Sequence, residues 1–183
     1  MKLTDMAIVF EIFCICLITV LHVKSANIHA EAVNEIMFNN VMDGIVEDAL
    51  RAGYKTIDWQ GLPVVSLDEV RKCFVAEKDI YSSEDRHILV YVDRAGFYVW
   101  NSELAWEWSS VVDFSNGEET PHEQKVYQLT DYLENNYNLR ISLPANDGES
   151  ITNTVEDYSL IAISFNRNSE VKSFSAAKIH KVD

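Results

Sequence analysis

The stretch AEAVNEIMFNNVMDGIVEDALRAG, residues 30–53, decides the fold of this chain. Its apolar residues recur at the i, i+3, i+4, i+7 spacing that places side chains on one face of a helix. That face holds Phe38, Val41, Met42, Ile45, Val46, Ala49 and Leu50, and the other side holds Asn40, Asp43, Glu47, Asp48 and Arg51. Gly53 is expected to end the helix in a left-handed conformation. The stretch therefore predicts a long amphipathic helix.

Most of the remaining sequence is rich in β-branched and aromatic residues, which are typical of strands. Strands are expected over residues 87–93, 97–100, 151–155, 158–165 and 171–179, with a tight turn at residues 93–96. A helix with one apolar face must cover a sheet or another helix. We therefore expect an α+β fold in which the N-terminal helix packs in a strongly curved antiparallel sheet.

Residues 1–25 have the composition of a cleaved signal peptide, with Lys2 near the start and an apolar run over residues 12–21 that is short for a membrane span. Val23 and Ser25 are small residues at the −3 and −1 positions, so we expect cleavage after Ser25. Residues 26–183 would then form a single domain. The rival interpretation is an uncleaved membrane anchor.

The chain has a formal net charge of −14 at pH 7. Nucleic acids and anionic lipid surfaces attract Lys and Arg rather than Asp and Glu. We therefore expect a secreted, extracellular, acidic protein that binds no nucleic acid and has no stable membrane insertion. With Cys14 and Cys16 in the expected signal, Cys73 has no internal disulfide partner. It is a buried small side chain, the bridge of a homodimer or, least favoured, a catalytic thiol.

Two further segments carry apolar residues that we expect in the core. Residues 53–68 predict a turn-rich connector in which Trp59 caps one end of the core, and residues 70–76 predict a strand with Phe74 inward. Residues 103–114 alternate strictly, which predicts one long strand. Its buried face would hold Leu104, Trp106, Trp108, Val112 and Phe114, and its exposed face Glu103, Glu107 and Asp113.

Residues 121–136 fit two structures. Thr120, Pro121 and Glu123 have the form of a helix-capping box, and Val126, Leu129 and Leu133 suit a helix. Residues 125–133 and 137–143 also fit a hairpin with its turn at residues 135–136. The residues alone leave both open.

No group of residues has the pattern of a reactive centre. Cys73 with His87, His122 or His180 supplies the only candidate nucleophile and base, and nothing around them marks a site. His122-Glu123 lacks the second His of a zinc motif, and the glycines are too scattered for a phosphate loop. We therefore predict no catalytic residue, no metal, no cofactor and no enzyme activity.

The helix at residues 33–52, the connector from Ile57-Asp58-Trp59 to Leu67-Asp68, and the tail over residues 151–165 and 171–174 resemble the tubular lipid-binding superfamily. Mite group 7 allergens and arthropod juvenile-hormone-binding and takeout proteins belong to it. The resemblance implies a bent antiparallel sheet wrapped around the helix, with a hydrophobic groove, and favours the hairpin at residues 125–143. The chain departs from this pattern because it lacks the early disulfide of the hormone binders and the second long helix.

Two functional hypotheses follow. The first is a secreted, non-enzymatic protein that binds a small hydrophobic or lipid-like ligand between helix and sheet. Its ligand-binding residues would be Phe38, Val41, Met42, Ile45, Trp106 and Trp108. The alternative is a secreted acidic protein-interaction module with a filled core, no ligand and a basic partner. A lipocalin-like carrier ranks third and an enzyme last.

Overall fold

The computed structural model describes residues 3–81, 86–102, 105–114, 126–144, 150–165 and 171–179. The chain divides into two compact units, Met1–Phe38 and Asn39–Asp183, and each is described by itself. Helix α1 (Leu3–Gly53) supplies the first unit and continues into the second. All other elements belong to the second unit, which we call the domain.

The elements of the domain after α1 are as follows in chain order. They are β1 (Tyr54–Ile57), β2 (Pro63–Val65), α2 (Leu67–Tyr81), β3 (Arg86–Asp93), β4 (Gly96–Asn101), β5 (Glu107–Ser109), β6 (Val111–Asp113), β7 (Val126–Gln128), α3 (Leu129–Glu134), β8 (Asn138–Pro144), β9 (Ser150–Glu156), β10 (Ser159–Phe165) and β11 (Val171–Lys178). The expected strands over residues 87–100 and 151–179 are confirmed by β3, β4, β9, β10 and β11.

The domain is organised by a five-stranded sheet of order β11-β10-β3-β4-β5. Every pair of neighbouring strands in it is antiparallel. The expected α+β class with an N-terminal helix and antiparallel sheets is therefore confirmed. β1-β2, β6-β7 and β8-β9 form separate two-stranded sheets. Within the residues that the structure describes, no strongly curved sheet wraps a helix.

The central strands of this sheet are buried on both faces. Side chains on one face form a hydrophobic core with β6, β7, α3, β8 and β9, because they share one continuous buried cluster. From the sheet this cluster contains Ile88, Val90, Val92, Phe97, Ile161, Ile163 and Phe165. Such alternation along paired strands leaves Leu89, Tyr91, Leu160 and Ala162 on the opposite face, where they are also buried.

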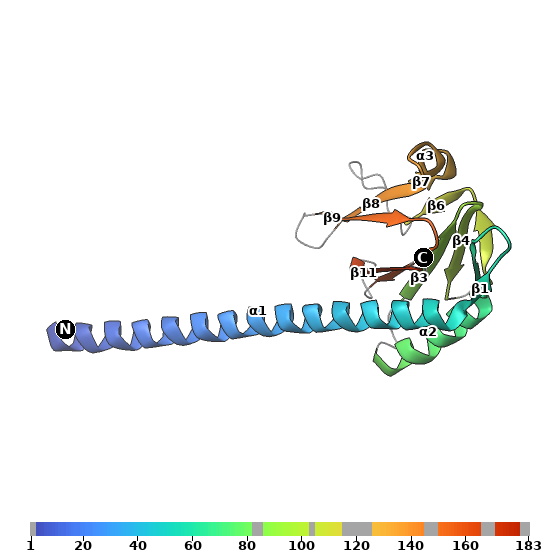
Figure 1. Ribbon diagram of the computed structural model, residues 1–183. Coiled ribbons are helices and arrows are strands. Elements are labelled where there is room, and N and C mark those ends of the chain that lie inside the picture. The colour runs from blue at the N-terminus through green and yellow to red at the C-terminus, as the bar shows by residue number, and fades with distance from the viewer. Residues whose placement is uncertain are drawn as a thin grey trace. The chain divides into compact units, whose positions relative to one another are not determined.

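Helices cover this opposite face. The part of α1 after Asn39 and the whole of α2 lie along the same side of the sheet, away from β6, β8 and β9 (Figure 1). Phe74 of α2 meets the ring of His87 of β3 edge-on at 5.6 Å between centroids. From α1, Met42, Val46 and Ala49 have no exposed surface. The domain is therefore a three-layer structure with the sheet in the middle.

The amphipathic pattern predicted for α1 is confirmed. Met42, Ile45, Val46, Ala49 and Leu50 are buried, whereas Asn40, Asp43, Glu47, Asp48 and Arg51 are exposed. Arg51 forms an ion pair with Glu47 at 2.6 Å. The left-handed conformation expected of Gly53 is wrong, because the glycines of positive φ in the described residues are Gly61 and Gly96. Gly53 is instead required by close packing, since a Cβ there would lie 2.3 Å from Cγ2 of Val70.

The strand expected over residues 70–76 is wrong, because helix α2 occupies this stretch. Val70, Phe74 and Lys78 are its buried residues, and their spacing of four is helical rather than alternating. Ser66 and Glu69 have the spacing of a capping box, and the Val70 amide donates to the Ser66 carbonyl at 3.1 Å. The inward position of Phe74 is confirmed.

The two expectations that placed tryptophans in the core are also wrong. Trp59 does not cap the core, since its side chain is 90% exposed at the turn between β1 and β2. The long strand over residues 103–114 breaks at Ser110 into β5, which pairs with β4, and β6, which pairs with β7. Val112 and Phe114 are buried as expected, but Trp108 is 56% exposed. Glu103 and Leu104 lie outside the described residues.

Neither structure expected for residues 121–136 is found in full. The helical part is short, α3 (Leu129–Glu134), and residues 115–125 lie outside the described part of the chain. The hairpin between residues 125–133 and 137–143 is wrong, because β7 pairs with β6 and β8 pairs with β9. Each of these strands finds its partner elsewhere in the layer that packs on the sheet.

Two glycines of α1 provide a matched stability test. We expect Gly44→Ala to stabilise the full-length chain by about 0.5–1 kcal/mol, because alanine favours the helix and nothing lies within 4 Å of the added Cβ. Gly53→Ala should instead destabilise it by about 1–3 kcal/mol, through the clash with Val70. Denaturant unfolding followed by circular dichroism measures both. Equal effects of the two substitutions would contradict the packing of α1 on α2.

Candidate functional site

The six predicted ligand-binding residues occupy different environments. Met42 and Ile45 are buried at 0% and 3% exposure, and Val41 is half-buried. Phe38 is half-buried and ends the first unit. Trp106 donates its Nε1 hydrogen to the Leu67 carbonyl at the start of α2, at 2.8 Å. Trp108 donates to Ala95 in the turn between β3 and β4, at 3.2 Å. The two indoles are therefore held by different elements.

The space around Met42 and Ile45 is filled by protein. Met42 has no exposed surface and Ile45 is only 3% exposed, so protein atoms cover both side chains. These residues pack as a close-packed core does. A lipid-like ligand against them would need the helix to move away from its present neighbours.

The surroundings of Cys73 disfavour its thiolate form. It is half-buried on α2 and its Sγ donates to Oε1 of Glu77 at 3.4 Å. Burial raises its pKa, and the hydrogen bond to Glu77 and the charges of Glu77 and Asp48 raise it further, to about 11. Because only the thiolate attacks or binds metals, Cys73 is poorly reactive near neutral pH.

His87 is a packed core residue. It has no exposed surface, its Nδ1 lies 2.9 Å from Oγ of Ser164, and its ring meets Phe74. His122 and His180 lie outside the described residues. Among the residues that the structure describes, no group of three or more His, Cys, Asp or Glu side chains could hold a metal ion.

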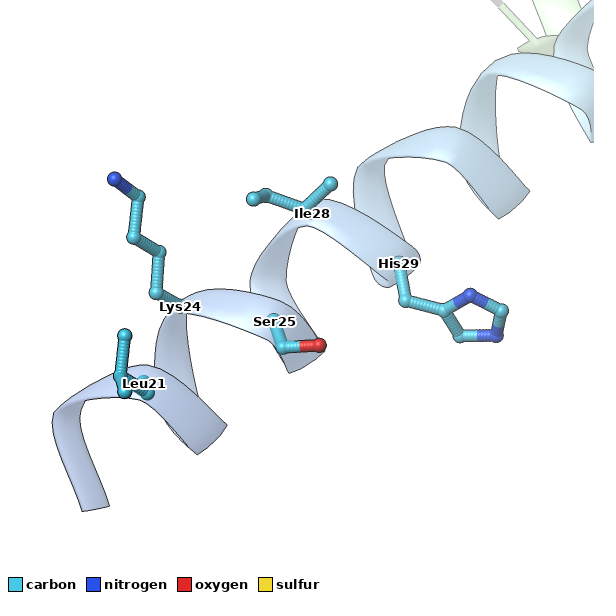
Figure 2. A pocket seen from close by; sticks show the side chains of 5 residues that line it. All are labelled: Leu21, Lys24, Ser25, Ile28 and His29. Carbon is cyan, nitrogen blue, oxygen red and sulfur yellow. The ribbon is translucent and has the colours of Figure 1, made fainter. Parts of the chain in front are cut away.

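A hollow on α1 is lined by side chains of that one helix. Figure 2 shows Leu21, Lys24, Ser25, Ile28 and His29 along consecutive turns of the ribbon. Their spacing places them on one helical face, and the hollow is the open groove between their side chains. No second element lines it in the described structure, so it is not a ligand cavity.

A richer group of residues meets at the end of the sheet where four turns lie. Arg94, between β3 and β4, donates from Nε to Oδ2 of Asp157, between β9 and β10, at 2.9 Å. Its guanidinium carbon lies 4.9 Å from the ring centroid of Tyr137 and 5.9 Å from that of Tyr158. Planar guanidinium groups stack on aromatic faces in this way. Arg94 therefore connects three turns that are far apart in the sequence.

Trp108 is fixed beside Arg94 by the same turn. The Asp93 carboxylate accepts hydrogen bonds from the amides of Ala95 at 2.7 Å and Gly96 at 3.1 Å, which orders the turn. The indole of Trp108 covers Gly96, where a Cβ would lie 2.5 Å from Nε1 of Trp108. Gly96 also has φ +151°, so both this contact and the backbone conformation exclude a side chain there. Only glycine lets Trp108 occupy this position.

Trp59 is presented by the turn between β1 and β2. The Asp58 carboxylate accepts hydrogen bonds from the amides of Gln60 and Leu62, both at 2.8 Å, and Gly61 has φ +77°. Asp58 of this turn lies near enough to Tyr158 to act on it electrostatically. Burial raises the pKa of Tyr158, Arg94 lowers it, and the carboxylates of Asp157, Asp93 and Asp58 raise it.

The backbone is strained in this region. Of the described residues other than glycine, those with positive φ are Asn136 at 55°, Tyr137 at 62° and Tyr158 at 58°. Such conformations cost energy in aromatic residues and persist only where packing enforces them. Here Tyr137 packs edge-on against Tyr132 at 5.7 Å and under Arg94. The strain therefore serves to present these tyrosines around Arg94.

We call this region the turn-end surface and define it by Trp59, Arg94, Trp108, Tyr137 and Asp157. Sequence reasoning expected the turn at residues 93–96 but placed both tryptophans inside. The Asp58-Trp59-Gln60-Gly61 pattern, which is typical of a tight turn, was the signal that could have placed Trp59 outside.

Comparison of the chain with known protein families, curated proteins and solved structures found no match. The resemblance to the tubular lipid-binding superfamily therefore stays a prediction.

The reactivity of Cys73 tests its surroundings. In a Cys14→Ser, Cys16→Ser background, we expect iodoacetamide to modify Cys73 at pH 8 about 100-fold more slowly than an unstructured cysteine peptide, because a pKa raised from 9.0 to about 11 leaves far less thiolate. The rate should keep rising with pH up to about 11. Glu77→Gln should increase the rate at pH 8 several-fold, since it removes a nearby negative charge. A rate at pH 8 equal to that of the peptide would contradict this account.

Proposed function

We propose that this chain is a non-enzymatic protein-interaction module held at a membrane by its first helix, with the domain on the outer side. The observation that carries the proposal is the segment Phe10–Ala30 of α1. It is 21 residues long, apolar enough to span a membrane, and 0% buried. A secretory signal near an N-terminus has the same features, so the proposal also needs the observations that follow.

The length of this segment and the distribution of its apolar side chains support a membrane anchor. A helix of 21 residues is about 31 Å long, which matches the hydrocarbon core of a bilayer. Its exposed large apolar residues lie on all sides of the helix, and such a helix is stable when an apolar medium surrounds it. They are Phe10, Ile12, Phe13, Ile15, Leu17, Ile18, Val20, Leu21, Val23 and Ile28. Helix α1 also continues without interruption through Ser25, the predicted cleavage position.

The charges that flank the segment favour an outward-facing domain. Residues 31–50 contain five acidic residues and neither Lys nor Arg, whereas Lys2 precedes the segment. Loops with Lys and Arg tend to stay on the cytoplasmic side of a membrane. The N-terminal flank would therefore remain inside and the domain would be delivered outside, which agrees with the predicted extracellular location.

Binding to a protein fits the domain better than binding a lipid-like ligand. The predicted ligand residues Met42 and Ile45 have almost no free space around them. Trp59 and Trp108 of the turn-end surface are instead 90% and 56% exposed. Exposed indoles beside an arginine are typical of protein interfaces. This supports the alternative interpretation, the acidic module with a filled core.

Membrane extraction tests the anchor. In cells that express the full chain, we expect the protein to resist extraction by alkaline carbonate and to retain residues 1–25 in its intact mass. Leu17→Arg combined with Ile18→Arg should release most of it, since each arginine costs about 2.5–3.5 kcal/mol at the centre of a membrane helix.

Asn40→Arg is the control, because Asn40 is an exposed position of the same helix beyond the segment. It should leave the protein in the membrane fraction. A soluble product that begins after Ser25 would overturn the anchor and restore the cleaved signal peptide.

A further inference from the structure

The turn-end surface has the composition and the rigidity of a docking site. Trp, Tyr and Arg are the residue types most enriched among those that dominate binding energy. Trp108 is held by Gly96 and Ala95 and Tyr137 by Arg94 before any partner arrives, and the turn that carries Trp59 is ordered by the hydrogen bonds of Asp58. Side chains that are already ordered lose little entropy on binding.

The charges of this surface are unbalanced toward acid. Asp58, Asp93, Glu156 and Asp157 surround it, and the cations paired with them in the described structure are Arg94 and Lys178. The whole chain carries a net charge of −14. Carboxylates attract Lys and Arg, and the face of an indole also binds cations. The complementary ligand therefore combines positive charge with apolar side chains.

The charge of the surface favours a protein over a lipid bilayer. Its carboxylates, among them Asp58 and Asp157, would repel anionic lipids.

We propose that the turn-end surface binds a basic segment of a partner protein, in which Lys or Arg alternates with apolar side chains that cover Trp59 and Trp108. This inference rests on the proposed function and names the partner class of that module. The cationic side chains of the segment meet the excess negative charge of the acidic residues that surround the indoles. The apolar side chains remove the two indoles from water.

Selection from a random peptide library tests the proposal. The full chain in detergent micelles is immobilised, and displayed peptides of twelve residues are selected on it. We expect the enriched sequences to contain Lys or Arg near Leu, Ile or Phe. Synthetic versions of these peptides should bind about tenfold or more weakly to Trp59→Ala and to Trp108→Ala than to the unchanged chain. Their affinity should fall as salt is raised.

Ile80→Ser is the matched control, because Ile80 is 74% exposed at the far end of α2. It should leave peptide affinity within about twofold of the unchanged chain. Circular dichroism confirms that each variant is folded. Phosphatidylcholine vesicles without and with phosphatidylglycerol are tested in parallel for binding through Trp59.

Three outcomes overturn the proposal. The first is a selection that enriches acidic peptides or none, the second is equal affinity of Trp59→Ala and the unchanged chain, and the third is vesicle binding that Trp59→Ala abolishes. None of them bears on carbonate extraction, so a failure of the partner class is distinguished from a failure of the membrane anchor.

Discussion

The antiparallel pairing of β3 with β10 is the interaction on which the rest of the domain depends. It joins residues about seventy positions apart in register from Ser159 opposite Val92 to Phe165 opposite Arg86. Both strands are buried on both faces, so their hydrogen bonds are closed to water and their side chains serve two cores. One core faces β8 and β9, and the other faces α1 and α2.

The same register also creates the turn-end surface. Because Val92 lies opposite Ser159, the turn after β3 and the turn before β10 meet at one end of the sheet. Arg94 and Asp157 are thereby brought within 2.9 Å although neither segment contains a recognisable motif. The exposed ion pair itself contributes little to stability. The guanidinium group of Arg94 also lies over the rings of Tyr137 and Tyr158.

Sequence patterns predicted where helices and strands lie better than they predicted which faces are buried and which strands pair. The spacing of Met42, Ile45, Val46 and Ala49 reports a helix directly, and the apolar runs of β3 and β10 report buried strands. Alternation around Trp106 and Trp108 reports which side chains share a face, but it does not report whether another layer covers that face. The turn residues Asp58 and Gly61 were the local signal for the exposed position of Trp59. The spacing of Ser66 and Glu69 was the local signal for the start of helix α2. The pairing of β6 with β7 had no local signal, because strand partners are chosen by the core they share.

Helix α1 combines two residue patterns. From Phe10 to Ala30 it is mostly apolar and exposed, and from Asn39 onward it has one buried face and one charged face. One helix can satisfy both patterns because backbone hydrogen bonds are internal to it in either medium. The first pattern supports anchoring in lipid, and the second orders the domain.

Native-state hydrogen exchange of the full chain tests most directly whether α1, β3 and β10 form one cooperative unit. The account predicts that amides of residues 46–50 of α1 exchange through the same global opening as those of residues 89–92 and 160–163, with the same free energy. If the α1 amides exchanged about 100-fold faster than the strand amides, the opening free energies would differ by about 2.7 kcal/mol. The helix would then be only loosely attached to the sheet, and the account of a filled core between them would be contradicted.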